Sequence, residues 1–199
     1  MPDGVLVFAP LWIESAVLPK RSDWTVIRSG MGPARARIAA ARGVAVDAPA
    51  VAIVGLCGAV SPELRAGDVV CATEVHRADA APVAVQSLAA LVRPLGLRAV
   101  EGPILSTDRV MRSEERRALD GVAAVDMESA WLAEAANGRP LAVLRVVVEE
   151  AQRDLVDVRT PAAGLRALRN MRRACAVLDE WATAAPRRDT DAYLAAVKA

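Results

Sequence analysis

Three segments of this chain share one arrangement, in which a short apolar run is followed at once by glycines or by a carboxylate. They are residues 29–32, residues 54–60 with residues 67–70 close behind, and residues 125–128. Apolar, β-branched runs of this length are typical of strands buried on both faces of a sheet. Ligands of an α/β sheet bind where its strands end, and glycines there let the backbone approach them closely. The arrangement therefore predicts a ligand site that these strand ends share.

Strand-like and helix-like runs alternate along the chain. The runs typical of strands cover residues 4–9, 24–28, 50–54, 69–75, 99–105, 122–125 and 141–148, and those typical of helices cover residues 13–18, 34–45, 82–92, 113–119, 128–136 and 161–181. This alternation predicts an α/β fold with a central, twisted, mostly parallel (mixed) sheet flanked by helices. At 199 residues the chain fits one domain. We expect that domain over residues 1–185, with residues 186–199 forming a C-terminal helix or tail.

Composition narrows the classes of partner. With 25 basic and 24 acidic residues the net charge is +1, so no overall field attracts nucleic acid. No run approaches the ~20 apolar residues of a membrane span, and the N-terminus lacks a signal-peptide pattern. The lone His76 and the scattered Cys57, Cys71 and Cys175 lack metal-ligand spacing, so we expect no metal and a reducing cytoplasm. No cofactor is expected, because the glycines lack the dinucleotide-binding pattern of an oxidoreductase.

The order of the motifs resembles that of the purine nucleoside phosphorylase and methylthioadenosine/S-adenosylhomocysteine nucleosidase superfamily, from about residue 5 to residue 151. The family's glycine-rich loop and following strand are similar to residues 55–60 and 67–70, its ribose-binding Met-Glu motif to Asp126-Met127-Glu128, its first loop to residues 9–14, and its Ser-Gly-Asp turn to residues 106–108. The resemblance implies a three-layer nucleoside phosphorylase-like fold and a nucleoside as the small-molecule partner. It also implies a homodimer or a larger homo-oligomer.

The resemblance implies roles for residues within these motifs. Glu128 would accept hydrogen bonds from the ribose hydroxyls, beside Asp126 and Met127, and Glu14 would activate an attacking water. Base or sugar would lie against Gly30, Leu56, Cys57 and Gly58, with Cys57 as a small packing residue rather than a nucleophile. The local sequence leaves simpler interpretations open. Each glutamate also suits the first turn of a helix, and the glycines also suit an ordinary turn between strand and helix.

The first departure from the family pattern concerns the nucleophile. Phosphorylases of the family carry a Ser or Thr after the first glycine of the loop and an Arg before it. Here Leu56 follows Gly55, and Ile53 and Val54 precede it. Because charge-assisted hydrogen bonds contribute ~1.5–3 kcal/mol each, their loss weakens phosphate binding. With Glu14 available, we expect water to attack instead of phosphate.

The second departure concerns the general acid. The family run that ends in an aspartate aligns with residues 145–151, where Glu149 takes the place of the aspartate and Val148 that of the preceding Ser. Glu149 can donate a proton to the leaving purine if a partly apolar setting keeps it protonated. Glu149 could instead be an ordinary solvated residue, in which case Glu150 or Asp154 is the next candidate.

The reaction expected from these residues is hydrolysis of the N-glycosidic bond of a 5′-substituted adenosine, with release of adenine. The chain also resembles the hopanoid-biosynthesis branch of the family, which implies an adenosylated hopanoid as substrate. Methylthioadenosine and S-adenosylhomocysteine are the alternative substrates. A phosphorolytic enzyme and a catalytically impaired nucleoside-binding protein remain alternative functions.

Overall fold

The computed structural model describes residues 4–152 and 160–185. The C-terminal helix or tail expected over residues 186–199 lies outside the described residues, as does Asp154. The strands run over β1 Val5–Ala9, β2 Thr25–Arg28, β3 Ala50–Ala59, β4 Val69–Arg77, β5 Ala80–Ala84, β6 Ala99–Ser106, β7 Ala124–Asp126 and β8 Leu141–Glu149.

These strands form one mixed sheet in which parallel pairs predominate. Parallel pairing joins β1 to β2 and β3, β3 to β8, β4 to β6, and β6 to β7. Antiparallel pairing joins β3 to β7, β4 to β5, and β4 to β8. The predicted mostly parallel, mixed sheet is therefore confirmed.

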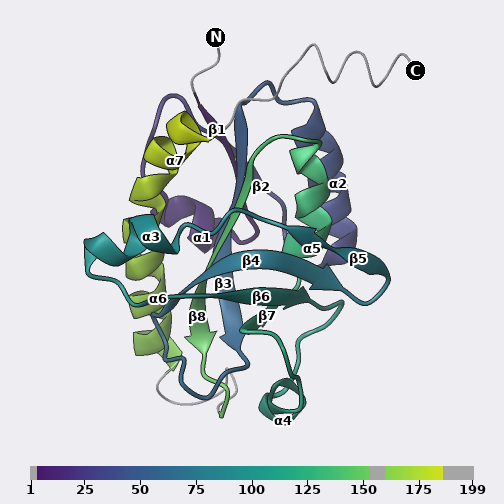
Figure 1. The fold of residues 1–199 in the computed structure, drawn as a ribbon, viewed down its shortest axis with the longest axis vertical. Helices are drawn as coiled ribbons and strands as arrows, with labels where there is room; N and C mark the ends of the chain where they lie inside the picture. Colours follow the sequence, from purple (N-terminus) through teal and green to yellow (C-terminus); the bar gives the residue numbers. More distant parts are fainter. Residues whose placement is uncertain (1–3, 153–159, 186–199) are drawn as a thin grey trace.

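Part of the sheet closes on itself. Strands β3, β7, β6 and β4 are neighbours in that order, and β8 pairs with both β3 and β4. These five strands therefore form a closed ring, while β1 and β2 extend the sheet beyond it (Figure 1). The closure brings the ends of β3, β7 and β8 together at one place.

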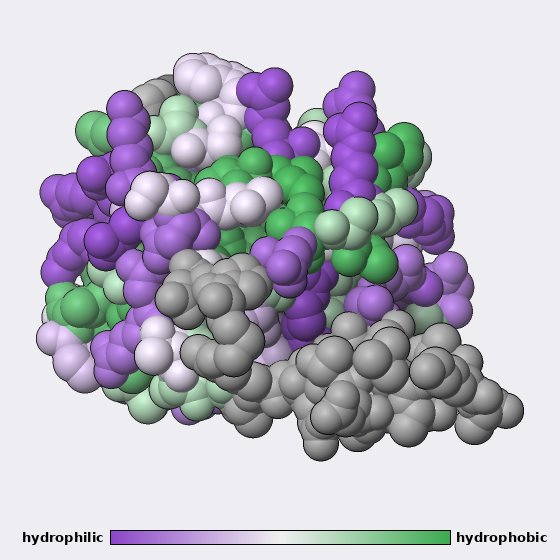
Figure 2. Space-filling model, turned by 90° about the horizontal axis from the view of Figure 1, so that it is seen from above, coloured by the Kyte–Doolittle hydropathy of each residue, from purple (hydrophilic) through white to green (hydrophobic). Residues whose placement is uncertain are grey.

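Helices cover the sheet on two sides. On one side lie α1 (Trp12–Val17), α3 (Ala89–Val92), α6 (Thr160–Ala174) and α7 (Leu178–Ala184), and on the other lie α2 (Pro33–Val44) and α5 (Ser129–Leu132) (Figure 1). Strand β1 shows why both sides are needed, because its alternate side chains enter two different cores. Val5 and Val7 belong to one, and Leu6 and Phe8 to the other. Figure 2 shows the molecule from above, turned by 90° from Figure 1. Hydrophilic residues dominate the face seen in that view, and hydrophobic residues gather near its middle.

Two predicted elements differ from the structure. The sequence predicts a helix over residues 82–92, but β5 (Ala80–Ala84) pairs with β4 as a hairpin. Within residues 82–92 only α3, Ala89–Val92, is α-helical. The segment at Gly55–Gly58 was expected to be a loop, yet β3 continues to Ala59 with a register shift between Cys57 and Gly58. The shift follows from pairing on both edges, because Gly58 lies opposite Val125 of β7 and Glu149 of β8.

The helix that follows the Met-Glu motif ends as the sequence indicates. The α-helix α5 tightens into a 3₁₀ turn, η2 (Ala133–Ala136), and Asn137 and Gly138 then take positive φ angles of 45° and 80°. Left-handed residues of this kind are common helix terminators. A short helix, α4 (Ser113–Arg117), lies after β6 and borders the site described next.

Candidate active site

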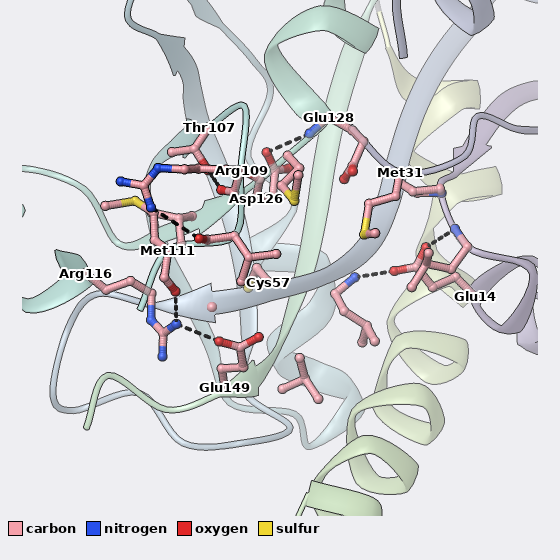
Figure 3. A pocket seen from close by; sticks show the side chains of 18 residues that line it. Glu14, Met31, Cys57, Thr107, Arg109, Met111, Arg116, Asp126, Glu128 and Glu149 are labelled. Carbon is pink, nitrogen blue, oxygen red and sulfur yellow. Dashed lines mark hydrogen bonds and ion pairs between the residues drawn. The ribbon is translucent and has the colours of Figure 1, made fainter. Parts of the chain in front are cut away.

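A cavity of about 200 Å³ lies where β3, β7 and β8 end and where α1 and α4 approach them (Figure 3). Eight of the sequence-predicted site residues line it: Glu14, Leu56, Cys57, Gly58, Asp126, Met127, Glu128 and Glu149. Apolar side chains from three loops supply much of the remaining wall, namely Pro10, Leu11, Met31, Val110 and Met111. The separate strand ends singled out in the sequence therefore share one cavity.

Gly30 is the predicted site residue that does not line the cavity. Its backbone N–H donates to the carbonyl of Pro10 at 2.9 Å, which ties the loop before α2 to the first loop. Its φ of 76° and the closeness of the Arg35 side chain leave no room for a Cβ. Gly30 therefore shapes the loop that brings its neighbour Met31 to the cavity wall.

Glu14 is held in place by the backbone of two segments. It lies in the first turn of α1 and is only 2% exposed. Its Oε2 accepts from the N–H of Leu11 at 2.6 Å, and its Oε1 accepts from the N–H of Leu56 at 2.8 Å. Burial raises the pKa of Glu14, and the charge of Arg145 opposes that rise. A fixed carboxyl group of this kind is suited to take up a proton.

Glu128 lies at the N-terminus of α5 and reaches toward the loop before α2. Its Oε1 accepts from the N–H of Gly32 at 2.8 Å. Burial raises the pKa of Glu128 to about 7, against the lowering effect of Arg145. The carboxylate faces the cavity (Figure 3), where it can accept hydrogen bonds from a pair of hydroxyl groups.

Arg145 is a part of the site to which sequence reasoning gave no role. It is fully buried in β8, with its Nη2 2.7 Å from Asp126 Oδ2 and 3.8 Å from Glu128 Oε2. It also donates to the hydroxyl of Ser129. Burial disfavours its charge, yet the carboxylates of Asp126, Glu128 and Glu14 hold its pKa above the ordinary value. A signal was present, because a cation inside the apolar run of residues 141–148 must have a buried partner.

The space for this guanidinium depends on Gly55. A Cβ at Gly55 would lie 2.2 Å from Arg145 Nη1 and 2.9 Å from Glu14 Oε1. Nη1 is buried, and it has no hydrogen-bond partner among residues 4–152 and 160–185. Because residue 55 is a glycine, the Arg145 guanidinium and the Glu14 carboxylate can both approach the β3 backbone closely.

Asp126 holds several of the site's residues in place through hydrogen bonds and an ion pair. Besides its ion pair with Arg145, it accepts hydrogen bonds from the hydroxyl of Ser106 and from the N–H of Ser129. These bonds fix the start of α5, and with it the position of Glu128. Asp126 also reaches the cavity wall, so it can both support and contact a ligand.

Glu149 lies on another wall of the cavity, beside a second cation that sequence reasoning missed. Arg116 of α4 is 1% exposed, and its Nη1 lies 2.6 Å from Glu149 Oε2. The same nitrogen donates to the carbonyl of Met111 at 2.7 Å. The partly apolar setting expected for Glu149 therefore contains a buried guanidinium. Nothing in the charged sequence of residues 113–117, which reads as a surface helix, indicated this pair.

Leu56, Cys57 and Gly58 form the floor of the cavity. Burial raises the pKa of the Cys57 thiol, so this side chain stays protonated and acts as packing. A Cβ at Gly58 would lie 3.1 Å from the Arg116 Cδ, so the glycine makes room for that side chain. Across residues 4–152 and 160–185 no group of three His, Cys, Asp or Glu side chains could hold a metal ion, and no helix could span a membrane.

Solved structures with this fold include enzymes that act on nucleosides. A Neisseria meningitidis 5′-methylthioadenosine/S-adenosylhomocysteine nucleosidase, in complex with methylthio-immucillin-A, aligns with a TM-score of 0.74 at 19% identity, covering 89% of this chain and 99% of that one. The Campylobacter jejuni nucleosidase of the same name gives 0.73 at 15% identity, over 89% and 97% of the two chains. A Helicobacter pylori futalosine hydrolase gives 0.70 at 16% identity, over 89% and 96%. At these identities the likeness establishes the fold.

Sequence comparison gives the family. None of the curated protein sequences matches the chain significantly. The family model of the phosphorylase superfamily matches residues 16–182 and so includes every lining residue named above from Met31 onward. Glu14 stands two residues before that match begins. Since the match spans most of its length, the chain belongs to the phosphorylase superfamily.

Proposed function

We propose that this protein hydrolyses the N-glycosidic bond of a 5′-substituted adenosine and releases adenine. The observation that carries the proposal is the placement of three carboxyl groups round one cavity. Glu14 and Glu128 lie beside Arg145, while Glu149 enters from another wall (Figure 3). Breaking this bond requires a held sugar, an activated nucleophile and a leaving base that accepts a proton. The three carboxyl groups can meet these requirements one by one.

The surroundings of Glu14 favour water over phosphate as the nucleophile. A phosphate dianion close to Glu14 would also lie close to Glu128, and both carboxylates would repel it. Arg145 could attract it, but the positive charge of that guanidinium is already balanced by Asp126, whose Oδ2 lies 2.7 Å from Nη2. A water molecule, in contrast, can donate a proton to Glu14. The carboxyl groups therefore favour hydrolysis, as do the apolar residues at the phosphate-binding positions of the sequence.

Glu128 is our candidate for holding the ribose. Its carboxylate can accept from the 2′- and 3′-hydroxyls, and Met127 next to it lines the cavity and can pack against the sugar. Leu56, Cys57 and Gly58 would then contact the nucleoside, and Gly30 would contribute by shaping the loop that brings Met31 to the cavity wall. The base would lie toward Glu149, where a proton donor is needed.

The 5′ substituent is proposed to be apolar, because Leu11, Met31, Val110 and Met111 contribute hydrophobic side chains to the wall. Methylthioadenosine and S-adenosylhomocysteine fit this description in part, and the names of two similar solved structures support them. An adenosylated hopanoid, with a much larger apolar group, is the third candidate.

The test is to incubate the purified chain with each of these nucleosides, with and without inorganic phosphate, and to separate the products by chromatography. We expect adenine to appear at the same rate in both conditions. A ribose 1-phosphate product that forms only with phosphate would assign a phosphorolytic reaction instead. Tight nucleoside binding without any product would assign a binding protein.

We also propose that the protein is a homodimer or a larger homo-oligomer. Support comes from the exposed face of α2, where Ala34, Ile38 and Ala41 follow one another at helical spacing and lie in solvent. Ile38 is 61% exposed in the single chain. A second copy of the chain packed against this face would remove these apolar side chains from solvent.

A further inference from the structure

Arg116 and Glu149 form an ion pair in the cavity wall, on the side where Arg109 and Met111 also lie (Figure 3). Arg116 is 1% exposed, and its guanidinium donates to three acceptors within residues 4–152 and 160–185. These are Glu149 Oε2 at 2.6 Å, the carbonyl of Met111 at 2.7 Å, and the carbonyl of Glu150 at 3.2 Å. Because two of the acceptors are backbone atoms, the guanidinium is fixed independently of the Glu149 side chain.

A fixed cation at this distance favours the carboxylate form of Glu149. An opposite charge within ~4–6 Å typically shifts a carboxyl group's titration downward by ~1–3 pH units. The other described titratable groups nearby act less directly. Cys57 stays a thiol, Glu150 accepts from the N–H of Ala66 at 3.2 Å, and Arg109 pairs with Glu115. Asp126, the last residue of β7, pairs with Arg145.

We propose that Arg116 is a positioning residue that sets the protonation state of Glu149, so that base release is fastest below neutral pH. This inference rests on the proposed function, in which Glu149 donates the proton. It concerns a residue of α4, which touches Glu149 rather than the reacting atoms of the substrate.

Protonated Glu149 transfers its proton to N7 of the purine while the C1′–N9 bond breaks, and the electron pair of that bond goes to the purine. The oxygen of a water molecule bonds to C1′, and the proton that this water loses passes to Glu14. Neutral adenine leaves, and Glu149 is then a carboxylate beside Arg116.

Arg116 has two opposing effects on this step. It stabilises the carboxylate that forms on Glu149, so each transfer from the protonated form becomes easier. It also lowers the fraction of Glu149 that is protonated at neutral pH, so fewer molecules can react. The net result is an activity whose optimum lies on the acid side of neutrality.

The experiment compares the pH profile of kcat/KM for adenine release in the unsubstituted protein and in Arg116→Met, with Arg116→Lys as a milder second variant. Arg98→Met is the matched control, because Arg98 pairs at 3.0 Å with a mostly buried carboxylate, Asp68, that does not line the cavity. We expect an optimum below about pH 7 for the unsubstituted protein. Without the guanidinium, the titration of Glu149 should move up by ~1–3 pH units. The optimum of a bell-shaped profile lies midway between the titrations of the acid and the base, so in Arg116→Met it should rise by about half that amount, ~0.5–1.5 units. Arg116→Lys should move it less, and Arg98→Met not at all.

A second comparison tests whether Arg116 acts through Glu149. In a Glu149→Gln background, which should have lost most activity, Arg116→Met should leave the residual pH profile unchanged. An optimum at or above neutrality, an unmoved optimum in Arg116→Met, or a shift that persists in the Glu149→Gln background would each overturn the role of Arg116. Those results still leave adenine release intact, whereas a protein that releases no base from any of the nucleosides overturns the proposed function as well.

Discussion

Glu14, Glu128 and Asp126 surround the buried guanidinium of Arg145, so several like charges are held close to one cation. Three carboxylates and one guanidinium carry more negative charge than positive when all are ionised. Burial is the main reason that the pKa values of Glu14 and Glu128 lie above their ordinary range; Arg145 opposes the rise, and the neighbouring carboxylate of Asp126 adds to it. Carboxyl groups with raised pKa values in a cavity are typical of sites that exchange protons with a ligand.

The first prediction at this scale concerns Glu14. Glu14→Gln keeps the size of the side chain and one oxygen that can accept from the N–H group of Leu11 or Leu56, but it replaces the other oxygen by an amide donor and removes the proton acceptor. We expect kcat/KM for adenine release to fall by ~10²-fold or more, the usual effect of losing a positioned general base. Glu180→Gln, on the exposed side of α7, is the control. Unchanged turnover in Glu14→Gln would remove Glu14 from the mechanism.

A second prediction follows from Glu128. Burial raises its pKa from 4.5 to about 7, so the folded state binds a proton more tightly than the unfolded state does. Its contribution to the free energy of unfolding is therefore fully present below pH 4.5 and is lost as the pH rises through about 7. Glu128→Gln has no such loss, so its stability relative to the unsubstituted protein should increase across this range. Urea unfolding at about pH 5 and about pH 8 measures the difference, and an equal difference at both pH values would contradict the assignment.

At the residue scale the sequence indicated part of the site. Glu14, Glu128 and Glu149 were placed on the cavity wall because their motifs resemble those of a known family. Arg145 could have been recognised from the sequence, because it is a charged residue inside an apolar strand, but it is given no role in the sequence analysis. Arg116 had none, since its burial depends on how α4 lies against the end of β8, a contact between residues far apart in the chain.

Secondary-structure elements show where local preference and tertiary pairing disagree. Residues 80–84 are rich in alanine, which favours a helix, but pairing of β5 with β4 gives them a partner strand. The glycines after Val54 suggested a loop, whereas pairing with β7 and β8 keeps them in β3. In both cases the deciding hydrogen bonds come from another strand, which the local sequence does not encode.

Two helical glycines give a prediction at the scale of elements. In α2, a Cβ at Gly43 would lie 2.4 Å from the Phe8 ring and 3.1 Å from Ala135 Cβ, whereas a Cβ at Gly164 in α6 would meet nothing within 4 Å. Gly43→Ala should therefore destabilise the protein by ~1–3 kcal/mol through overpacking of α2 against β1 and η2. Gly164→Ala should stabilise it by ~0.5–1 kcal/mol, because alanine suits a helix better. Chemical denaturation of both variants checks the pair, and equal effects would show that helix preference alone decides.

For the whole molecule, the closed ring of strands explains how distant segments form one site. Gly58 pairs with both Val125 and Glu149, so β3 links the Met-Glu motif to the strand that carries the proposed acid. The layered α/β fold was predictable from the alternation of runs along the chain. The ring was not, because the pairing of β8 with both β3 and β4 depends on contacts across the whole sequence.

The last prediction concerns assembly. Ile38 stands in the middle of the apolar stripe on α2, and a charge there would be buried without a partner if two copies meet at this face. We expect the unsubstituted protein to have at least twice the mass of the 21.0 kDa chain by light scattering at micromolar concentration. Ile38→Asp should shift it toward the single-chain mass. Leu165→Asp is the matched control, because Leu165 is 71% exposed on α6, across the sheet from α2, and should leave the mass unchanged. A monomeric unsubstituted protein would refute the assembly, and an Ile38→Asp oligomer of full size would place the interface on another face.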